Sequence, residues 1–179
     1  MKKILTVVTI FLGLTLAPKP ALALTEAGGS AVLRTRSSEN QIDPRVEKLE
    51  NYLKQHHSPL ADYSQVFVTE ADRYQIEWKL VPAITGLESS FGKRIPYNSY
   101  NAYGWANGNY YFDSWEQSIK HVTRVLKEKY YDRGLDTVSK IAPVYAPPSD
   151  TWTSKVNFFM NKIDSFSNTG SLEQLSLTI

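Results

Sequence analysis

Cysteine is absent from this chain of 179 residues. Its absence excludes disulfide bridges, a cysteine nucleophile and a lipid-modified cysteine, so the hydrophobic core alone has to hold the fold together. A chain of this length buries enough apolar surface to do so.

Histidine is scarce as well, with only His56, His57 and His121 in the chain. Two of the three are adjacent, and neighbouring side chains diverge on a helix, so the pattern does not favour a shared metal site. No Ser-His-Asp order and no glycine-rich phosphate loop stands out. We therefore expect neither a metal nor an organic cofactor.

Long apolar runs are missing except near the N-terminus, where residues 4–17 follow the basic pair Lys2-Lys3. This run is shorter than the span of about 20 residues that a membrane helix needs. Ala21-Leu22-Ala23 then has the small-x-small pattern of a signal-peptidase site. We predict that residues 1–23 are a cleaved signal peptide; an uncleaved N-terminal anchor is the alternative. The expected product is secreted (extracellular, cell-wall associated, or periplasmic if the host has an outer membrane) and keeps no membrane anchor.

A surplus of positive charge is also missing once residues 1–23 are removed, since 17 basic and 18 acidic side chains then remain. A nucleic-acid-binding protein normally has a concentrated basic face, so nucleic acid is not an expected partner. The charge is nevertheless uneven, because residues 24–77 sum to −3 and residues 78–166 to +3. The mildly basic second half favours an anionic polymer such as a cell wall as the partner. We expect the protein to be a monomer.

The chain after residue 23 divides into a polar linker (residues 24–42), one helical domain (residues 43–167) and a loose tail (residues 168–179). Apolar residues recur at helical spacing through the domain, which predicts an all-α fold. An N-cap residue followed by proline, at Asp43-Pro44 and at Ser58-Pro59, indicates two helix starts. The predicted helices begin at or near Asp43, Ser58, Trp78, Asp113, Thr137 and Trp152.

A non-helical segment separates the third and fourth predicted helices. In residues 105–112 (WANGNYYF), aromatic side chains flank the pair Asn107-Gly108. Asn-Gly between such residues is typical of a tight turn, so we predict a small β-hairpin here.

One acidic residue occupies an unusual place. Glu88 lies in the final turn of the third predicted helix, after an apolar stretch over residues 81–87. The negative end of the helix dipole and the apolar neighbours both disfavour an ionised carboxylate, so we expect its pKa to be raised. A carboxyl that stays protonated near neutral pH suits a general acid that cleaves glycosidic bonds. An exposed structural glutamate is the alternative, and the local pattern does not decide between the two.

Four short sequence blocks follow one another in a defined order between about Tyr74 and Phe166, and the first of them contains Glu88. They are Glu88-Ser89-Ser90-Phe91-Gly92, Asn101-Ala102-Tyr103-Gly104-Trp105, Phe112-Asp113-Ser114-Trp115-Glu116, and Tyr145-Ala146-Pro147-Pro148 with Trp152 and Val156. This series resembles the bacterial endo-β-N-acetylglucosaminidase family of autolysins. That family shares the lysozyme-like fold with soluble lytic transglycosylases and goose-type lysozymes. The resemblance implies a lysozyme-like helical domain that cleaves β-1,4 bonds in peptidoglycan glycan strands.

The resemblance also implies roles for individual residues. Glu88 matches the catalytic acid of the family, and Tyr145 matches a tyrosine near the scissile bond. Substrate-binding positions in the cleft are implied for Ser89, Asn101, Tyr103 and Gly104. To these we add Trp105 and Trp152, whose indole faces are suited to stack on sugar rings; plain core packing is the alternative for both.

A second carboxylate is not evident. Glucosaminidases often present one from a longer β-lobe, but residues 105–112 contain no acid, and we assign Asp113 and Glu116 to helix capping. A substrate-assisted route is then more natural, with the N-acetyl oxygen or the muramyl 6-hydroxyl of the substrate attacking the anomeric carbon. The sequence leaves open glucosaminidase, muramidase and lytic transglycosylase activity, and also a non-catalytic module that binds the cell wall.

Overall fold

The computed structural model describes residues 43–167, so the predicted signal peptide, linker and C-terminal tail lie outside the described residues. Within residues 43–167 the regular structure is entirely helical, which confirms the predicted all-α class. The α-helices are α1 (Pro44–Gln55), α2 (Ser64–Tyr74), α3 (Leu80–Ser89), α4 (Trp115–Lys129), α5 (Val138–Tyr145) and α6 (Trp152–Asp164). No helix in this part of the chain is both long and apolar enough to span a membrane.

Three of the helix starts follow from local side-chain capping. The carboxylate of Asp43 accepts a hydrogen bond from the backbone N–H of Arg45 at 2.8 Å, and the hydroxyls of Ser114 and Thr137 cap α4 and α5 in the same way. The helix start predicted at Ser58 lies six residues before the observed start of α2 at Ser64. The Ser58 hydroxyl instead accepts from the N–H of Leu60, and a 3-10 turn at Ala61–Tyr63 precedes α2.

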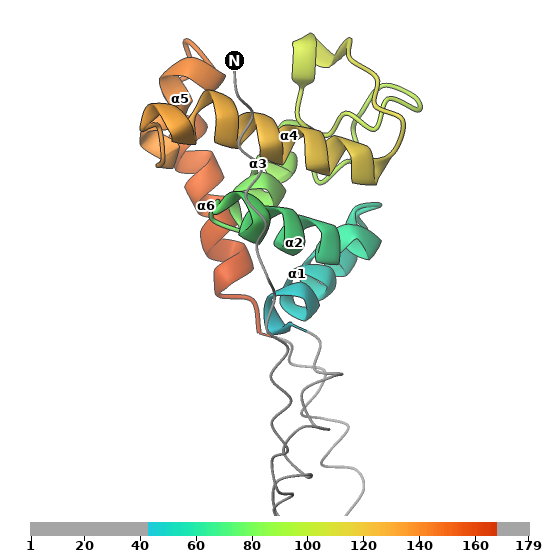
Figure 1. Ribbon diagram of the computed structural model, residues 1–179. Coiled ribbons are helices and arrows are strands. Elements are labelled where there is room, and N and C mark those ends of the chain that lie inside the picture. Colours follow the sequence, from blue (N-terminus) through green and yellow to red (C-terminus); the bar gives the residue numbers. More distant parts are fainter. Residues whose placement is uncertain (1–42, 168–179) are drawn as a thin grey trace, which may run out of the picture. The chain divides into compact units, whose positions relative to one another are not determined.

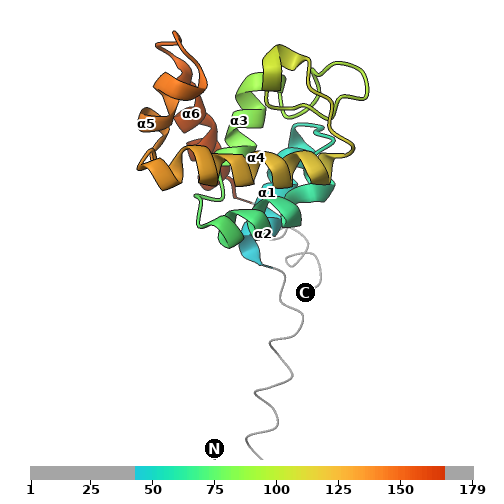
Figure 2. The same ribbon diagram turned by 45° about the horizontal axis from the view of Figure 1, so that its top comes forward.

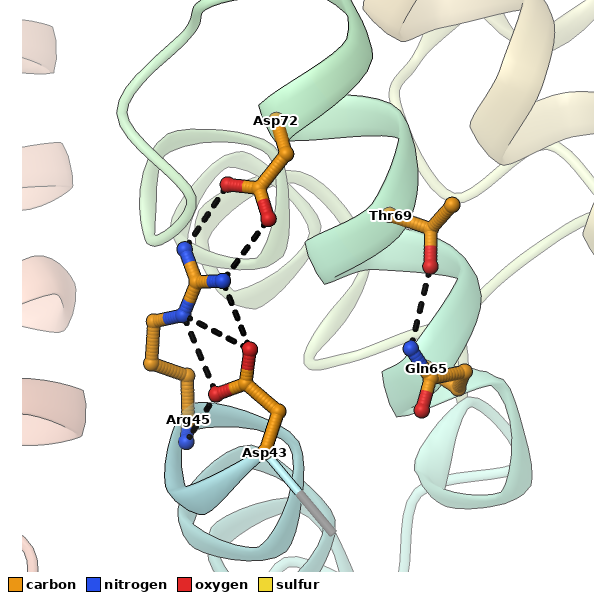
Figure 3. Close-up of polar contacts among 5 residues, drawn as sticks. All are labelled: Asp43, Arg45, Gln65, Thr69 and Asp72. Carbon is orange, nitrogen blue, oxygen red and sulfur yellow. Dashed lines mark hydrogen bonds and ion pairs between the residues drawn. The ribbon is translucent and has the colours of Figure 1, made fainter. Parts of the chain in front are cut away.

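An ion-pair cluster joins the start of α1 to the end of α2 (Figure 3). The guanidinium of Arg45 lies between two carboxylates, with Nη2 2.6 Å from Asp43 Oδ2 and 2.7 Å from Asp72 Oδ2. Nearby on α2, the side chain of Gln65 donates to the hydroxyl of Thr69 at 3.0 Å (Figure 3). Two parallel hydrogen bonds make the Arg45–Asp72 pair bidentate, and it links the start of α1 to the end of α2.

Helix α3 runs through the middle of the other helices (Figures 1 and 2) and packs against both α4 and α6. It is apolar around nearly its whole circumference, as expected of a helix covered on every side. Gly86 permits the close approach of α6, because a Cβ at this position would lie 3.2 Å from Phe159 and 2.6 Å from the ring of Phe91. The last turn of α3 emerges from this core and carries Glu88.

The segment 105–112 does not form the predicted β-hairpin, since residues 43–167 contain no β-strand. Asn107 and Gly108 do adopt the positive φ angles (54° and 83°) that an Asn-Gly turn favours. The flanking backbone does not pair into strands, because the side chain of Asn101 binds it instead. Asn101 donates to the carbonyls of Trp105 and Tyr110 at 2.9 and 3.0 Å and accepts from the N–H of Trp105 at 3.0 Å.

The two ends of the described chain lie together. Lys48 of α1 donates to the carbonyl of Asp164, the last residue of α6, at 2.8 Å. Figure 1 shows these ends on the opposite side of the domain from the α5–α6 connection and from the loop before α4. The end of α3 that carries Glu88 is therefore not covered by the start or the end of the domain.

Candidate functional site

A cavity of about 430 Å³ opens beside the last turn of α3. Its lining comes from α3, from the α5–α6 connection and from α6: Leu87, Glu88, Ala146, Pro147, Pro148, Ser149, Trp152 and Lys155. The structure thus brings together the first and last of the four sequence blocks, which are more than fifty residues apart in the chain.

The carboxyl group of Glu88 is held from two sides and remains open to solvent. Its Oε1 accepts a hydrogen bond from the indole N–H of Trp152 at 3.0 Å. Its Oε2 lies against Gly104, where an added Cβ would be 3.4 Å away. Gly104 has a φ of +67°, so glycine suits this position for both its conformation and its lack of a side chain.

The pKa of Glu88 is raised above its ordinary value, as predicted. The main cause is desolvation by the surrounding apolar groups, while the hydrogen bond from Trp152 stabilises the carboxylate and lowers the pKa in part. The net direction favours a proton on Glu88 at a higher pH than on a fully hydrated glutamate. This is the protonation state that a general acid requires.

Trp152 is part of the site, but as a hydrogen-bond donor. Its side chain is only 3% exposed, so its ring is covered by protein and offers no face on which a sugar could stack. The indole N–H points to Glu88. Trp152 is therefore placed to position the carboxyl group, and the expected stacking role has no support in the geometry.

Tyr145 lies next to Trp152, with ring centroids 5.0 Å apart. Its hydroxyl donates to the backbone carbonyl of Tyr103 at 3.2 Å. Burial, followed by the negative charge of Glu88, raises the pKa of Tyr145, so it is a neutral phenol rather than a nucleophile. Its single proton is engaged by the Tyr103 carbonyl, so the hydroxyl has to leave that carbonyl before it can donate to another group.

Ser89 and Asn101 support the site from below its surface. Both are buried, with 3% and 2% exposure. The Ser89 hydroxyl lies 2.8 Å from the carbonyl of Ala102, which it can donate to, and it accepts from the N–H of Gly92 at 2.9 Å. These bonds and those of Asn101 shape the loop beside Glu88. Neither side chain is accessible to a ligand, so the implied direct contact with substrate is replaced by a positioning role.

Tyr103 and Trp105 are not among the residues that line the cavity. The ring of Tyr103 is 2% exposed, and it is the backbone carbonyl of this residue that bonds to Tyr145. Trp105 is half-buried, with its ring edge-to-face against His121 at 5.5 Å. The structure therefore does not bring the Trp105 ring into the lining of the cavity.

We predicted that Asp113 and Glu116 cap α4, but the structure assigns the cap to a different residue. Ser114 caps α4, while Glu116 pairs with Lys120 on the exposed face of the helix at 2.5 Å. Neither acid lines the cavity that contains Glu88. Among the residues that line the cavity, Glu88 is the one acid.

Sequence reasoning missed the basic residue of the cavity, Lys155. The available signal was its position three residues after Trp152, which places both side chains on one face of α6. Leu87 and Ser149 were likewise not singled out, because nothing local distinguishes them from ordinary helix and loop residues.

No protein-family model matches this chain, and no curated protein sequence matches it either. Within residues 43–167, no group of three or more histidine, aspartate or glutamate side chains is placed to hold a metal ion.

Proposed function

We propose that this protein is a lysozyme-like peptidoglycan hydrolase that cleaves β-1,4 glycosidic bonds, with Glu88 as the proton donor. The observation that carries the proposal is the setting of Glu88. A carboxyl group with a raised pKa lies at a solvent-open cavity and is held by the indole N–H of a buried tryptophan. Resemblance to the glucosaminidase family over the four sequence blocks adds the substrate class.

The geometry suggests which oxygen delivers the proton. Oε1 of Glu88 is the acceptor of the Trp152 hydrogen bond, so in the protonated acid the proton resides on Oε2. Proton transfer from Oε2 to the glycosidic oxygen assists cleavage of the bond between that oxygen and the anomeric carbon. We assign Tyr145 a supporting role at the same reaction centre, because its ring packs on Trp152; its hydroxyl would leave the Tyr103 carbonyl to donate to the substrate.

The substrate supplies the nucleophile in this proposal, because Glu88 is the one acid among the residues that line the cavity. The N-acetyl oxygen attacks the anomeric carbon to form an oxazoline, which water then opens, giving a reducing end. Alternatively the muramyl 6-hydroxyl attacks, loses its proton to the Glu88 carboxylate and closes a 1,6-anhydro ring. The first route is that of a glucosaminidase and the second that of a lytic transglycosylase; the first is the preferred candidate on the resemblance.

The test compares the purified protein with its Glu88→Gln variant on isolated sacculi. Glutamine keeps the volume and accepts the Trp152 bond but has no proton to deliver, so cleavage should fall by at least about 10²–10⁴-fold. Glu116→Gln is the matched control, because Glu116 lies on the surface of α4 outside the cavity, and it should retain full activity.

Mass spectrometry of the released fragments identifies the reaction. Reducing N-acetylglucosamine ends indicate a glucosaminidase, reducing muramic acid ends a muramidase, and anhydro-muramic ends a lytic transglycosylase. Wild-type cleavage that survives Glu88→Gln contradicts the proposed mechanism. No cleavage by the wild type, with unchanged affinity of both proteins for sacculi, indicates a binding module instead.

A further inference from the structure

Lys155 lies in the same cavity as Glu88. It is on α6, one helical turn after Trp152. Of the eight residues that line the cavity, Glu88 is the one acid and Lys155 the one base. Most of the remaining lining is apolar, from Leu87 and from residues 146–148.

The ammonium group of Lys155 is not used by the fold. It has no hydrogen bond or ion pair with any of residues 43–167. Some lysines of the domain have carboxylate partners, such as Lys79 with Asp164 at 2.6 Å and Lys140 with Asp136 at 2.7 Å, whereas others, like Lys155, do not. Lys155 is exposed, so its charge is free to meet an anionic group of a ligand in the cavity, with the modest strength of a surface ion pair.

Glycan strands offer such an anion only when they contain muramic acid. Its lactyl ether ends in a carboxyl group that is either free or joined to a peptide stem, which carries carboxylates of its own. A polymer of N-acetylglucosamine alone is neutral. A charged side chain at one end of the cavity therefore separates the two substrate classes.

We propose that Lys155 binds a carboxylate of the substrate and makes the cavity selective for muramic-acid-containing strands over neutral N-acetylglucosamine polymers. The proposal rests on the proposed function, since it names the substrate class of the same site. Lys155 acts in binding and not in bond cleavage, so its effect belongs in KM and in affinity rather than in kcat.

The experiment uses Lys155→Gln, Lys155→Glu and Lys155→Arg, with Lys129→Gln as the matched control. Lys129 is an exposed lysine of α4 that likewise has no ion pair among residues 43–167 and lies outside the cavity. Three soluble substrates are compared: glycan fragments with peptide stems, the same fragments after removal of the stems by an amidase, and chitohexaose. The affinity of each for the proteins is also measured in the Glu88→Gln background, where no cleavage interferes.

Loss of the charge should raise KM and Kd for the muramic-acid substrates by about three- to fivefold, and charge reversal should raise them further. Chitohexaose binding should not change, and Lys155→Arg should restore the preference. Loss only with the stem-free fragments assigns the lactyl carboxylate, because that carboxyl is joined to the peptide as an amide in the other fragments. Loss only with stems attached assigns a stem carboxylate, and loss with both shows that either carboxylate is bound.

Equal Kd values for Lys155→Gln and wild type on every substrate overturn the inference, as does an equal loss on chitohexaose. Both results leave the proposed function intact as long as Glu88→Gln abolishes cleavage. Failure of the proposed function is recognised separately, by wild-type protein that does not cleave sacculi.

Discussion

The two sides of Glu88 are built in different ways. On the α6 side, the buried ring of Trp152 holds Oε1 through one hydrogen bond. On the other side, residues 93–112 form a loop without regular strands whose backbone reaches Oε2 at Gly104. The α6 side is ordinary helix packing, whereas the loop side contains left-handed backbone at several non-glycine residues: Asn98, Tyr100, Ala106 and Asn107.

The loop side also exposes aromatic rings, whereas the α6 ring that bonds to Glu88 is buried. Tyr97 and Tyr111 are 87% and 60% exposed, in contrast to 3% for Trp152. Strained backbone in a loop persists only when surrounding bonds over-determine it, and here Asn101 and Ser89 make those bonds. Helix packing therefore orients the carboxyl group of Glu88, while buried polar side chains determine the shape of the loop beside it.

After Glu88→Gln, the largest effect is expected from removal of the Tyr145 hydroxyl, because Tyr145 contacts both sides through the Trp152 ring and the Tyr103 carbonyl. If it donates in the transition state, Tyr145→Phe should cost about 2–4 kcal/mol, or about thirty- to a thousandfold in rate. The loss also frees the Tyr103 carbonyl, so a small drop in Tm is expected. Initial rates on sacculi, with circular dichroism to confirm folding, measure both; an unchanged rate would make Tyr145 a packing residue only.

Asn101→Ala tests the loop side alone. It leaves the backbone groups of Trp105 and Tyr110 without partners, at a cost of about 1–3 kcal/mol in the free energy of unfolding or of loop opening. Hydrogen exchange should rise in residues 101–112 and remain unchanged in α6. Equal exchange in the variant and the wild type would show that Asn101 does not hold the loop.

Trp152→Phe tests the α6 side alone. Phenylalanine cannot donate to Oε1, so the rate should fall by about tenfold through loss of orientation, which corresponds to about 1.4 kcal/mol. Because the lost bond lowers the pKa of Glu88, its removal raises that pKa further. The alkaline limb of the pH–rate profile should then move to higher pH. A profile that falls in height without moving would assign Trp152 a packing role.

Gly104→Ala tests the point where the loop meets the carboxyl. A side chain at a φ of +67° is strained, at a cost of about 1 kcal/mol in the free energy of unfolding. The added methyl group would lie 3.4 Å from Oε2 of Glu88, the proposed proton donor, so activity should fall more than the change in Tm alone explains. Gly134→Ala, with a φ of +78° and no atom within 4 Å of the added Cβ, is the matched control for strain without crowding. Equal activity losses in the two variants would show that crowding of Glu88 Oε2 by the added methyl group does not contribute to the loss.

The smallest effect concerns stability and pH. Since the folded state raises the pKa of Glu88, wild-type stability relative to Glu88→Gln is highest below the ordinary glutamate pKa and declines as the pH rises through the raised value. Thermal melts of both proteins across this pH window should show that the Tm of Glu88→Gln rises relative to that of the wild type as the pH increases. A variant that loses Tm selectively at higher pH would show that the carboxylate stabilises the fold.

Local sequence signals were sufficient for most of the fold. The helix starts at Asp43, Ser114 and Thr137 are determined by side chains that bind backbone N–H groups within three residues, and such bonds can be read from the chain alone. The raised pKa of Glu88 was also predictable, because its apolar neighbours along α3 are already visible in the sequence. The Asn-Gly turn at residues 107–108 adopted its expected φ angles for the same local reason.

Tertiary structure decided everything that depends on distant partners. Whether residues 105–112 pair into strands depended on a side-chain amide of Asn101 that competes for their backbone groups. The role of Trp152 depended on the packing of α6 against α3. This packing buries the indole ring, so the ring is not free for stacking, and its N–H donates to Glu88. Lys155 joined the cavity through the same packing, because helix periodicity places it beside Trp152 and only the fold places both beside Glu88.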